Sequence, residues 1–247
     1  DRYCDGTVPC SWARRRRATH HVQVCGARTG SDTALIVTRA LDPRRSDNLR
    51  APFATPGMRI GLLGGSFNPA HEAHRAISLA ALKRLGLDQV WWLVTTGNPL
   101  KDVSRLPPVA ERVRDATHIA SHPQITVTGF DGGAGSPYTA DLLAALVQRY
   151  PGVHFVWLMG ADNLATVHHW KNWPEVFKLV PIAVLDRPGY RLKARASKAA
   201  HRFARAFVDE SDATGLADLE PPAWTILSHR LSELSSTALR ENVLESD

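Results

Sequence analysis

From Met58 onward, short apolar runs alternate with stretches of helical periodicity, and this alternation limits the possible folds more than any other feature. The apolar runs have the length and the β-branched or aromatic content of buried strands. They are 58–65, 89–95, 125–130, 153–160 and 182–187. The stretches with helical spacing are 72–86, 108–121, 138–150 and 174–180. This order predicts an α/β, Rossmann-like, doubly wound and mostly parallel sheet with helices on both faces.

The remainder of the body is less regular. Residues 190–207 are spaced like one helix whose solvated face carries Arg191, Arg195, Lys198, Arg202 and Arg205. An acidic, mobile connector is expected at 208–222, a last strand at 223–228 and a final helix at 234–244. Parallel sheets bind ligands beyond the carboxyl ends of their strands. Function is therefore expected in the loops 64–71, 95–101, 129–138, 160–173 and 186–190.

Residues 1–57 differ in composition from the body, 58–247. They hold ten Arg, five Asp and all three cysteines, whereas the body holds 20 basic and 19 acidic residues. We interpret 1–57 as a basic, disordered or mistranslated extension, with the functional domain at 58–247. The alternative is a basic arm for nucleic acid or membrane lipid. The nearly neutral body argues against nucleic acid, and no apolar run approaches the roughly 18 residues of a transmembrane helix.

The stretch "GGSFNPAHEAH" (64–74) combines a glycine-ended strand, a turn and a helix start. Glycines allow a close backbone approach, and the free N–H groups at a helix start favour an anion. His71 and His74 are three residues apart, so both would face a phosphate bound there. Zinc is the weaker interpretation, because the spacing is not H-E-x-x-H and the body has no cysteine. Histidines that only cap the helix are a third interpretation.

A second anion site is predicted at "LSSTALR" (234–240), where hydroxyl caps precede Arg240 by one helical turn. Taken alone, this stretch is an ordinary capping sequence. Together the two stretches suggest a polyphosphate held from two sides.

These two stretches resemble the paired signatures of the nucleotidylyltransferase superfamily, G-[TS]-F-[DN]-P-x-H-x-[GA]-H and I-S-S-T-x-[IVL]-R. Within it, the chain is similar to bacterial nicotinate-nucleotide adenylyltransferases over about 58–243, in "TTGNPLK", "SPYTADLL", "GADNLATVHHWKNW" and "DRPGY". The resemblance implies a cytoplasmic enzyme that transfers an adenylyl group from ATP, accompanied by Mg²⁺, to nicotinate mononucleotide. It implies that the protein has no metal site of its own and no nucleic-acid or membrane partner. It is compatible with an oligomer.

The resemblance also implies roles for individual residues. His74 and His71 would support the α-phosphate and its neighbours. The other residues expected to bind ATP are Gly64, Gly65, Ser66, Phe67, Asp162, Ser236, Thr237 and Arg240. Lys101, Thr139 and Trp170 would bind the mononucleotide through its phosphate, its carboxylate and its ring. As alternatives, Lys101 is a solvated loop lysine and Trp170 a core residue. Trp91 and Trp92 are expected in the core.

The chain departs from the signature at Asn68, where Asp is frequent, and at Ala73, where Gly is frequent. Neither change removes a donor from the histidines, so activity is still expected. The alternatives are a nicotinamide-mononucleotide, pantetheine-phosphate or cytidylyl transferase, a nucleic-acid-binding protein, or a relative without activity.

Overall fold

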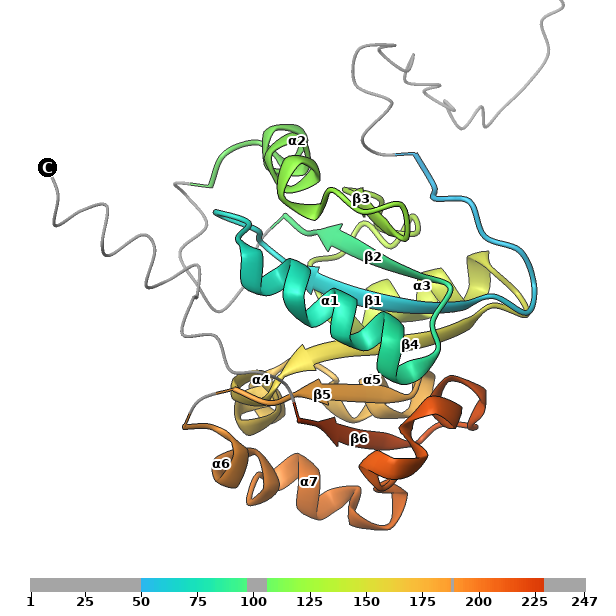
Figure 1. Ribbon diagram of the computed structural model, residues 1–247, viewed down its shortest axis with the longest axis vertical. Helices are drawn as coiled ribbons and strands as arrows, with labels where there is room; N and C mark the ends of the chain where they lie inside the picture. The colour runs from blue at the N-terminus through green and yellow to red at the C-terminus, as the bar shows by residue number, and fades with distance from the viewer. Residues whose placement is uncertain (1–49, 97–105, 188, 229–247) are drawn as a thin grey trace, which may run out of the picture. The chain divides into compact units, whose positions relative to one another are not determined.

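The computed structural model describes residues 50–96, 106–187 and 189–228, whose strands form one parallel sheet (Figure 1). The strands are β1 (Arg59–Gly65), β2 (Gln89–Val94), β3 (Ile125–Thr128), β4 (His154–Gly160), β5 (Ile182–Leu185) and β6 (Trp224–Leu227). Their order is β3-β2-β1-β4-β5-β6, and each neighbouring pair is parallel. This is the strand order of a doubly wound Rossmann fold, which confirms the predicted class.

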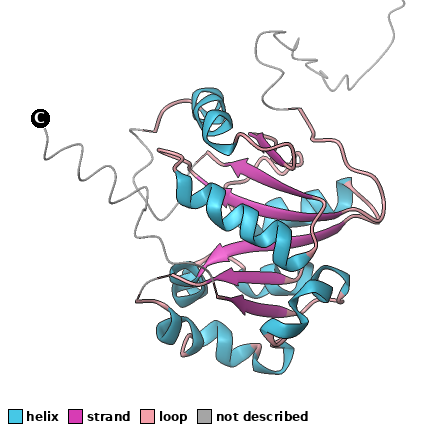
Figure 2. Ribbon diagram, viewed as in Figure 1, coloured by secondary structure: helices cyan, strands magenta, loops and turns pink. Residues whose placement is uncertain are grey.

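Helices cover both faces of this sheet (Figure 2). The four expected helices are present as α1 (Glu72–Leu85), α2 (Val109–Ala120), α3 (Thr139–Arg149) and α5 (Trp173–Leu179). Two apolar clusters result, one beneath α1 and α2 and the other beneath α3 and α5. Trp91 and Trp92 are both fully buried, one in each cluster, because successive side chains of a strand point to opposite faces. Their predicted place in the core is confirmed.

The expected loop 160–173 contains helical turns instead. These are α4 (Ala161–Thr166) and the 3₁₀ helix η3 (Val167–His169). Leu164 and Val167 are fully buried against the sheet, which stabilises turns that are too short to show a clear period. None of the described helices is both long and apolar enough to cross a membrane.

The prediction of one basic helix over 190–207 is wrong. The chain forms α6 (Arg191–Arg195), α7 (Lys198–Arg202) and the 3₁₀ helix η4 (Ala204–Ala206). The break lies at Ser197, whose buried Oγ accepts a hydrogen bond of 3.2 Å from the N–H of Ala200 and so begins a new helix. The basic residues therefore do not share one face.

The prediction of a mobile acidic connector at 208–222 is also wrong. Residues Glu210–Asp218 form the 3₁₀ helix η5, whose Ala213, Leu216 and Ala217 are buried in the cluster beneath α1. These apolar residues recur at three- and four-residue spacing within an acidic stretch, so composition concealed them. The final strand, β6, follows as expected.

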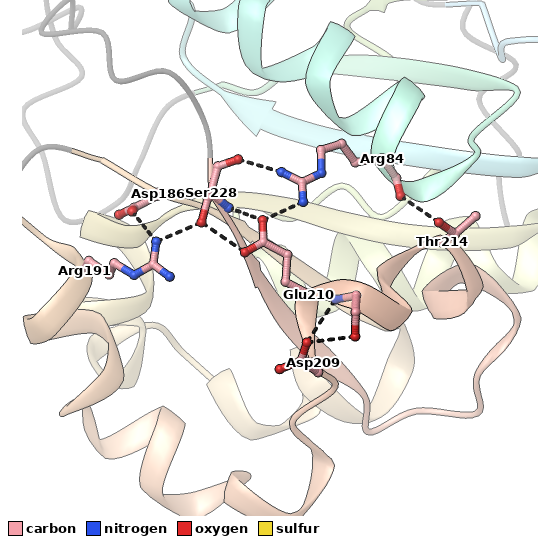
Figure 3. A network of polar contacts seen from close by, with 8 residues as sticks. Arg84, Asp186, Arg191, Asp209, Glu210, Thr214 and Ser228 are labelled. Carbon is pink, nitrogen blue, oxygen red and sulfur yellow. Dashed lines mark hydrogen bonds and ion pairs between the residues drawn. The ribbon is translucent and has the colours of Figure 1, made fainter.

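A polar network holds η5 against the ends of α1 and β6 (Figure 3). The carboxylate of Glu210 accepts hydrogen bonds from Ser228 and pairs with Arg84 at 2.6 Å. Arg191 donates to both Ser228 and Asp186, at 2.9 Å each. Burial acts to raise the pKa of Glu210, but the bonds from Ser228 and Arg84 outweigh it and lower that pKa. The network thus fixes the chain at Ser228, beyond β6.

Residues 50–57, at the end of the predicted extension, contact the domain. The hydroxyl of Tyr150 donates to the carbonyl of Pro52 at 2.8 Å, and the N–H of Gly57 donates to the carbonyl of Gly152 at 2.7 Å. Residues 1–49 lie outside the described chain, so a disordered or mistranslated extension stays a prediction for them.

Candidate active site

The candidate site lies where the strand order reverses, at the carboxyl ends of β1 and β4. β1 ends at Gly65 and leads through the turn 66–70 into α1, while β4 ends at Gly160 and leads directly into α4. Because β1 and β4 are parallel neighbours, the turn and the start of α4 lie at the same edge of the sheet. This places the predicted phosphate turn beside Asp162.

His71 and His74 meet at the first turn of α1, as predicted. His71 is the N-cap residue, and its backbone N–H donates to Nδ1 of His74 at 3.2 Å. The ring centroids are 3.9 Å apart. Since Nδ1 of His74 accepts this hydrogen bond, the neutral ring must carry its own proton on Nε2. His74 is therefore held as a neutral N–H donor.

Burial keeps both imidazoles neutral. It lowers the pKa of His74 to about 3, and His71, which would be positively charged whenever it is protonated, acts in the same direction. Burial also lowers the pKa of His71, followed by the positive charge of Arg187. The Nδ1 atom of His71 is buried and has no partner among the described residues. The pair thus offers hydrogen-bonding nitrogens without a fixed charge.

Aromatic packing supports His74 from below. Phe67 is 2% exposed, and its ring lies 4.8 Å from His74 and stacks 5.1 Å from Trp92. The indole N–H of Trp92 donates to Ser78 Oγ, which donates in turn to the carbonyl of His74. The Phe67 side chain is thus a support for His74 within the core. That leaves only its backbone, in the left-handed region at φ 46°, for contact with a nucleotide.

The glycines at the end of β1 have packing reasons of their own. A Cβ on Gly64 would collide with the Trp157 ring, whereas one on Gly65 would meet Phe67 only at 3.4 Å. The absence of a side chain at Gly64 is therefore required by the core. Ser66 stands at the start of the turn, and its carbonyl accepts a hydrogen bond from Arg112.

Across the switch point, Asp162 pairs with Arg187, which follows β5, at 2.7 Å. The other carboxylate oxygen of Asp162 is buried and has no partner among the described residues. It lies against Gly160, where a Cβ would collide with it. Arg187 was missed as a site residue, although it directly follows a buried strand, in "DRPGY". Its charge also acts to lower the pKa of both His71 and His74.

The predicted mononucleotide residues lie on α3 and after η3. Thr139 is the first residue of α3, as predicted, and is partly exposed. Trp170 is half-buried and packs against the core cluster beneath α3 and α5. The structure therefore combines the two alternatives for this indole, since one part contacts the core and another remains accessible. Lys101, Ser236, Thr237 and Arg240 lie outside the described residues.

No group of three or more His, Cys, Asp or Glu side chains suited to a metal ion occurs among the residues that the structure describes. Mg²⁺ binds readily through phosphates and water together with few protein ligands. The donors at this edge are instead imidazole nitrogens, helix amides and the guanidinium of Arg187. This chemistry suits the oxygens of a phosphate chain.

Comparisons with known proteins agree with this geometry. A family model described as cytidylyltransferase-like matches residues 62–242. A probable nicotinate-nucleotide adenylyltransferase of Methylorubrum extorquens (strain PA1) is 58% identical over 183 residues, covering 74% of this chain and 99% of that protein. One of Rhizobium johnstonii is 48% identical over 196 residues, covering 79% and 98%.

A solved structure has a similar fold. It is the Plasmodium falciparum nicotinic acid mononucleotide adenylyltransferase complexed with NaAD, with a TM-score of 0.55 and 18% identity. The match covers 74% of this chain and 83% of that one.

Proposed function

The chain belongs to the cytidylyltransferase-like family, within its nicotinate-nucleotide adenylyltransferases, and from this we propose how its residues carry out the reaction. The enzyme transfers the adenylyl group of ATP to nicotinate mononucleotide, giving nicotinate adenine dinucleotide and pyrophosphate. A phosphate oxygen of the mononucleotide attacks the α-phosphorus, and the bond to the bridging oxygen of the β-phosphate breaks. The attacking oxygen is already anionic, so no protein nucleophile is required.

His74 donates a hydrogen bond from its Nε2–H to an α-phosphate oxygen as charge develops there. The observation that carries this role is the bond from the N–H of His71 to Nδ1 of His74, since it fixes the proton on Nε2. A neutral donor held in place needs no reorganisation during the reaction. His71 and the first N–H groups of α1 bind the neighbouring phosphate oxygens.

Arg187 and Asp162 serve the opposite side of the ATP site. The guanidinium, held by Asp162 at 2.7 Å, neutralises part of the phosphate charge. The unpartnered oxygen of Asp162 accepts a hydrogen bond from the ribose of the adenylate. Gly64, Gly65, Ser66 and the Phe67 backbone line the turn, and Ser236, Thr237 and Arg240 bind the β- and γ-phosphates.

Trp170 stacks on the nicotinate ring, and Thr139 donates to its carboxylate. Lys101 binds the mononucleotide phosphate. Half-burial of Trp170 supports its role, because an indole anchored on the core presents a rigid face at little entropic cost.

Mg²⁺ enters with ATP, held mainly by phosphates and water, and supplies charge neutralisation at the phosphate chain. We also assign the enzyme to the cytoplasm, since ATP is its substrate and its body, 58–247, holds no cysteine that needs an oxidising compartment.

Pyrophosphate release from the full chain with Mg-ATP tests the assignment. Nicotinate mononucleotide should be the best acceptor, compared with nicotinamide mononucleotide and phosphopantetheine under the same conditions. Release with phosphopantetheine but none with nicotinate mononucleotide would contradict the substrate assignment.

A further inference from the structure

A buried arginine lies behind the site and has no role in the mechanism above. Arg112, on α2, is 3% exposed, and its neighbour Arg114 on the same helix is exposed. No carboxylate of the described residues forms an ion pair with Arg112. Burying an arginine side chain without a counterion is costly, so the residue is expected to have a specific reason for its place.

Its partners are three backbone carbonyls from two different loops. Nη1 donates to the carbonyl of Ser66 at 2.6 Å and to that of Thr95 at 2.8 Å, and Nε donates to Pro107 at 2.9 Å. Ser66 belongs to the phosphate turn after β1. Thr95 and Pro107 stand on either side of residues 97–105, in the connection from β2 to α2. One guanidinium therefore holds the turn and both described ends of the next loop.

Thr95 strengthens the same junction. Its N–H donates to the carbonyl of Gly65 at 3.0 Å, and its hydroxyl donates to that carbonyl at 3.3 Å. Under the proposed function, the turn serves ATP, and the loop that begins at Thr95 serves the mononucleotide. Hydrogen bonds from a charged donor are about twice as strong as neutral ones, so Arg112 dominates this junction.

We propose that Arg112 is a positioning residue that fixes the turn after β1 and the described ends of the connection from β2 to α2 against each other, so that one side chain sets the binding of ATP and of nicotinate mononucleotide together. The inference rests on the proposed function for the identity of the two substrates. It differs from a role in folding alone, because it predicts a change in substrate binding by a protein that is still folded.

Arg112→Lys tests this, because the ammonium keeps the charge but cannot donate from two separate nitrogens to three carbonyls. Arg114→Lys, at the exposed position on the same helix, is the matched control. We expect the KM values for ATP and nicotinate mononucleotide to rise together in Arg112→Lys, each by about tenfold, the factor that one charge-assisted hydrogen bond provides. The fall in kcat should be smaller, and Arg114→Lys should match the wild type.

A lower melting temperature for Arg112→Lys with both KM values unchanged would overturn the proposal, and so would a rise in only one KM. If Arg112→Lys gives no cooperative melting transition, Arg112→Gln replaces it, since its neutral amide removes the cost of a buried charge while still reaching one carbonyl. The KM values of Arg112→Gln for ATP and for nicotinate mononucleotide then test the proposal in the same way. A wild-type chain that releases no pyrophosphate with nicotinate mononucleotide would instead refute the proposed function.

Discussion

Replacing His74 by asparagine separates the helix cap that the structure shows from the phosphate contact that we propose for this side chain. The Oδ1 atom of asparagine takes the place of Nδ1 and can still accept the N–H of His71, now bonded at 3.2 Å. No atom of asparagine reaches the position of Nε2, so the donor to the phosphate is lost. His74→Asn therefore keeps the helix cap and removes the proposed catalytic contact.

The expected loss of stability and the expected loss of kcat in His74→Asn differ enough in size to be distinguished. The variant keeps the cap, which is worth about 1 kcal/mol, but loses ring packing against Phe67 and Trp92 of about 0.5–1.5 kcal/mol. We therefore expect the free energy of unfolding to fall by about 1 kcal/mol. Loss of one preorganised donor to a developing oxyanion lowers kcat by about 10²–10³.

Urea unfolding gives the free energy of unfolding, and steady-state pyrophosphate release with saturating ATP and nicotinate mononucleotide gives kcat. His118→Asn, at an exposed position on α2, is the control and should leave both unchanged. A kcat for His74→Asn within about threefold of the wild type would refute the donor role.

Three further outcomes are expected. The folded pKa of His74, about 3, lies below its ordinary value of 6.5, so between these two pH values the unfolded chain binds a proton at this residue and the folded chain does not. The contribution of this residue to the free energy of unfolding should thus fall by about 1.3 kcal/mol as the pH falls from 5.5 to 4.5, and urea unfolding of His74→Asn at these two pH values should lack that share. Trp170→Ala should raise the KM for nicotinate mononucleotide more than the KM for ATP, whereas Trp170→Phe, which keeps an aromatic ring, should have a KM for nicotinate mononucleotide near that of the wild type. An equal rise in the two KM values of Trp170→Ala would contradict stacking. Glu210→Gln should lower the free energy of unfolding at pH 7 by about 1–2 kcal/mol, with Glu220→Gln as the exposed control. Because the folded pKa of Glu210 is depressed below 4.5, this difference should be complete above pH 4.5 and disappear as the pH falls further, as thermal melting can show.

The accuracy of the sequence predictions depended on the range of the interactions that decide each element. The first three βα units, together with β4 and α5, were predicted to within about two residues, since period and stop signals such as Gly86, in the left-handed region at φ 60°, are local. η5 was mistaken for a connector because Leu216 is buried by α1, which is distant in the sequence. The break at Ser197 was missed because a cap within a basic stretch looks like one more polar residue.

The sequence by itself determined the fold class, the turn between β1 and α1 and the pairing of His71 with His74, because each depends on spacing within one element or one turn. Only the tertiary structure brought Arg187 to Asp162, placed Phe67 beneath His74 and buried Arg112 against two loops. These contacts depend on how parallel strands are ordered in the sheet and on which face of a helix is buried. A guanidinium looks the same in the sequence whether it meets water or the carbonyls of Ser66 and Thr95, and packing decided between them.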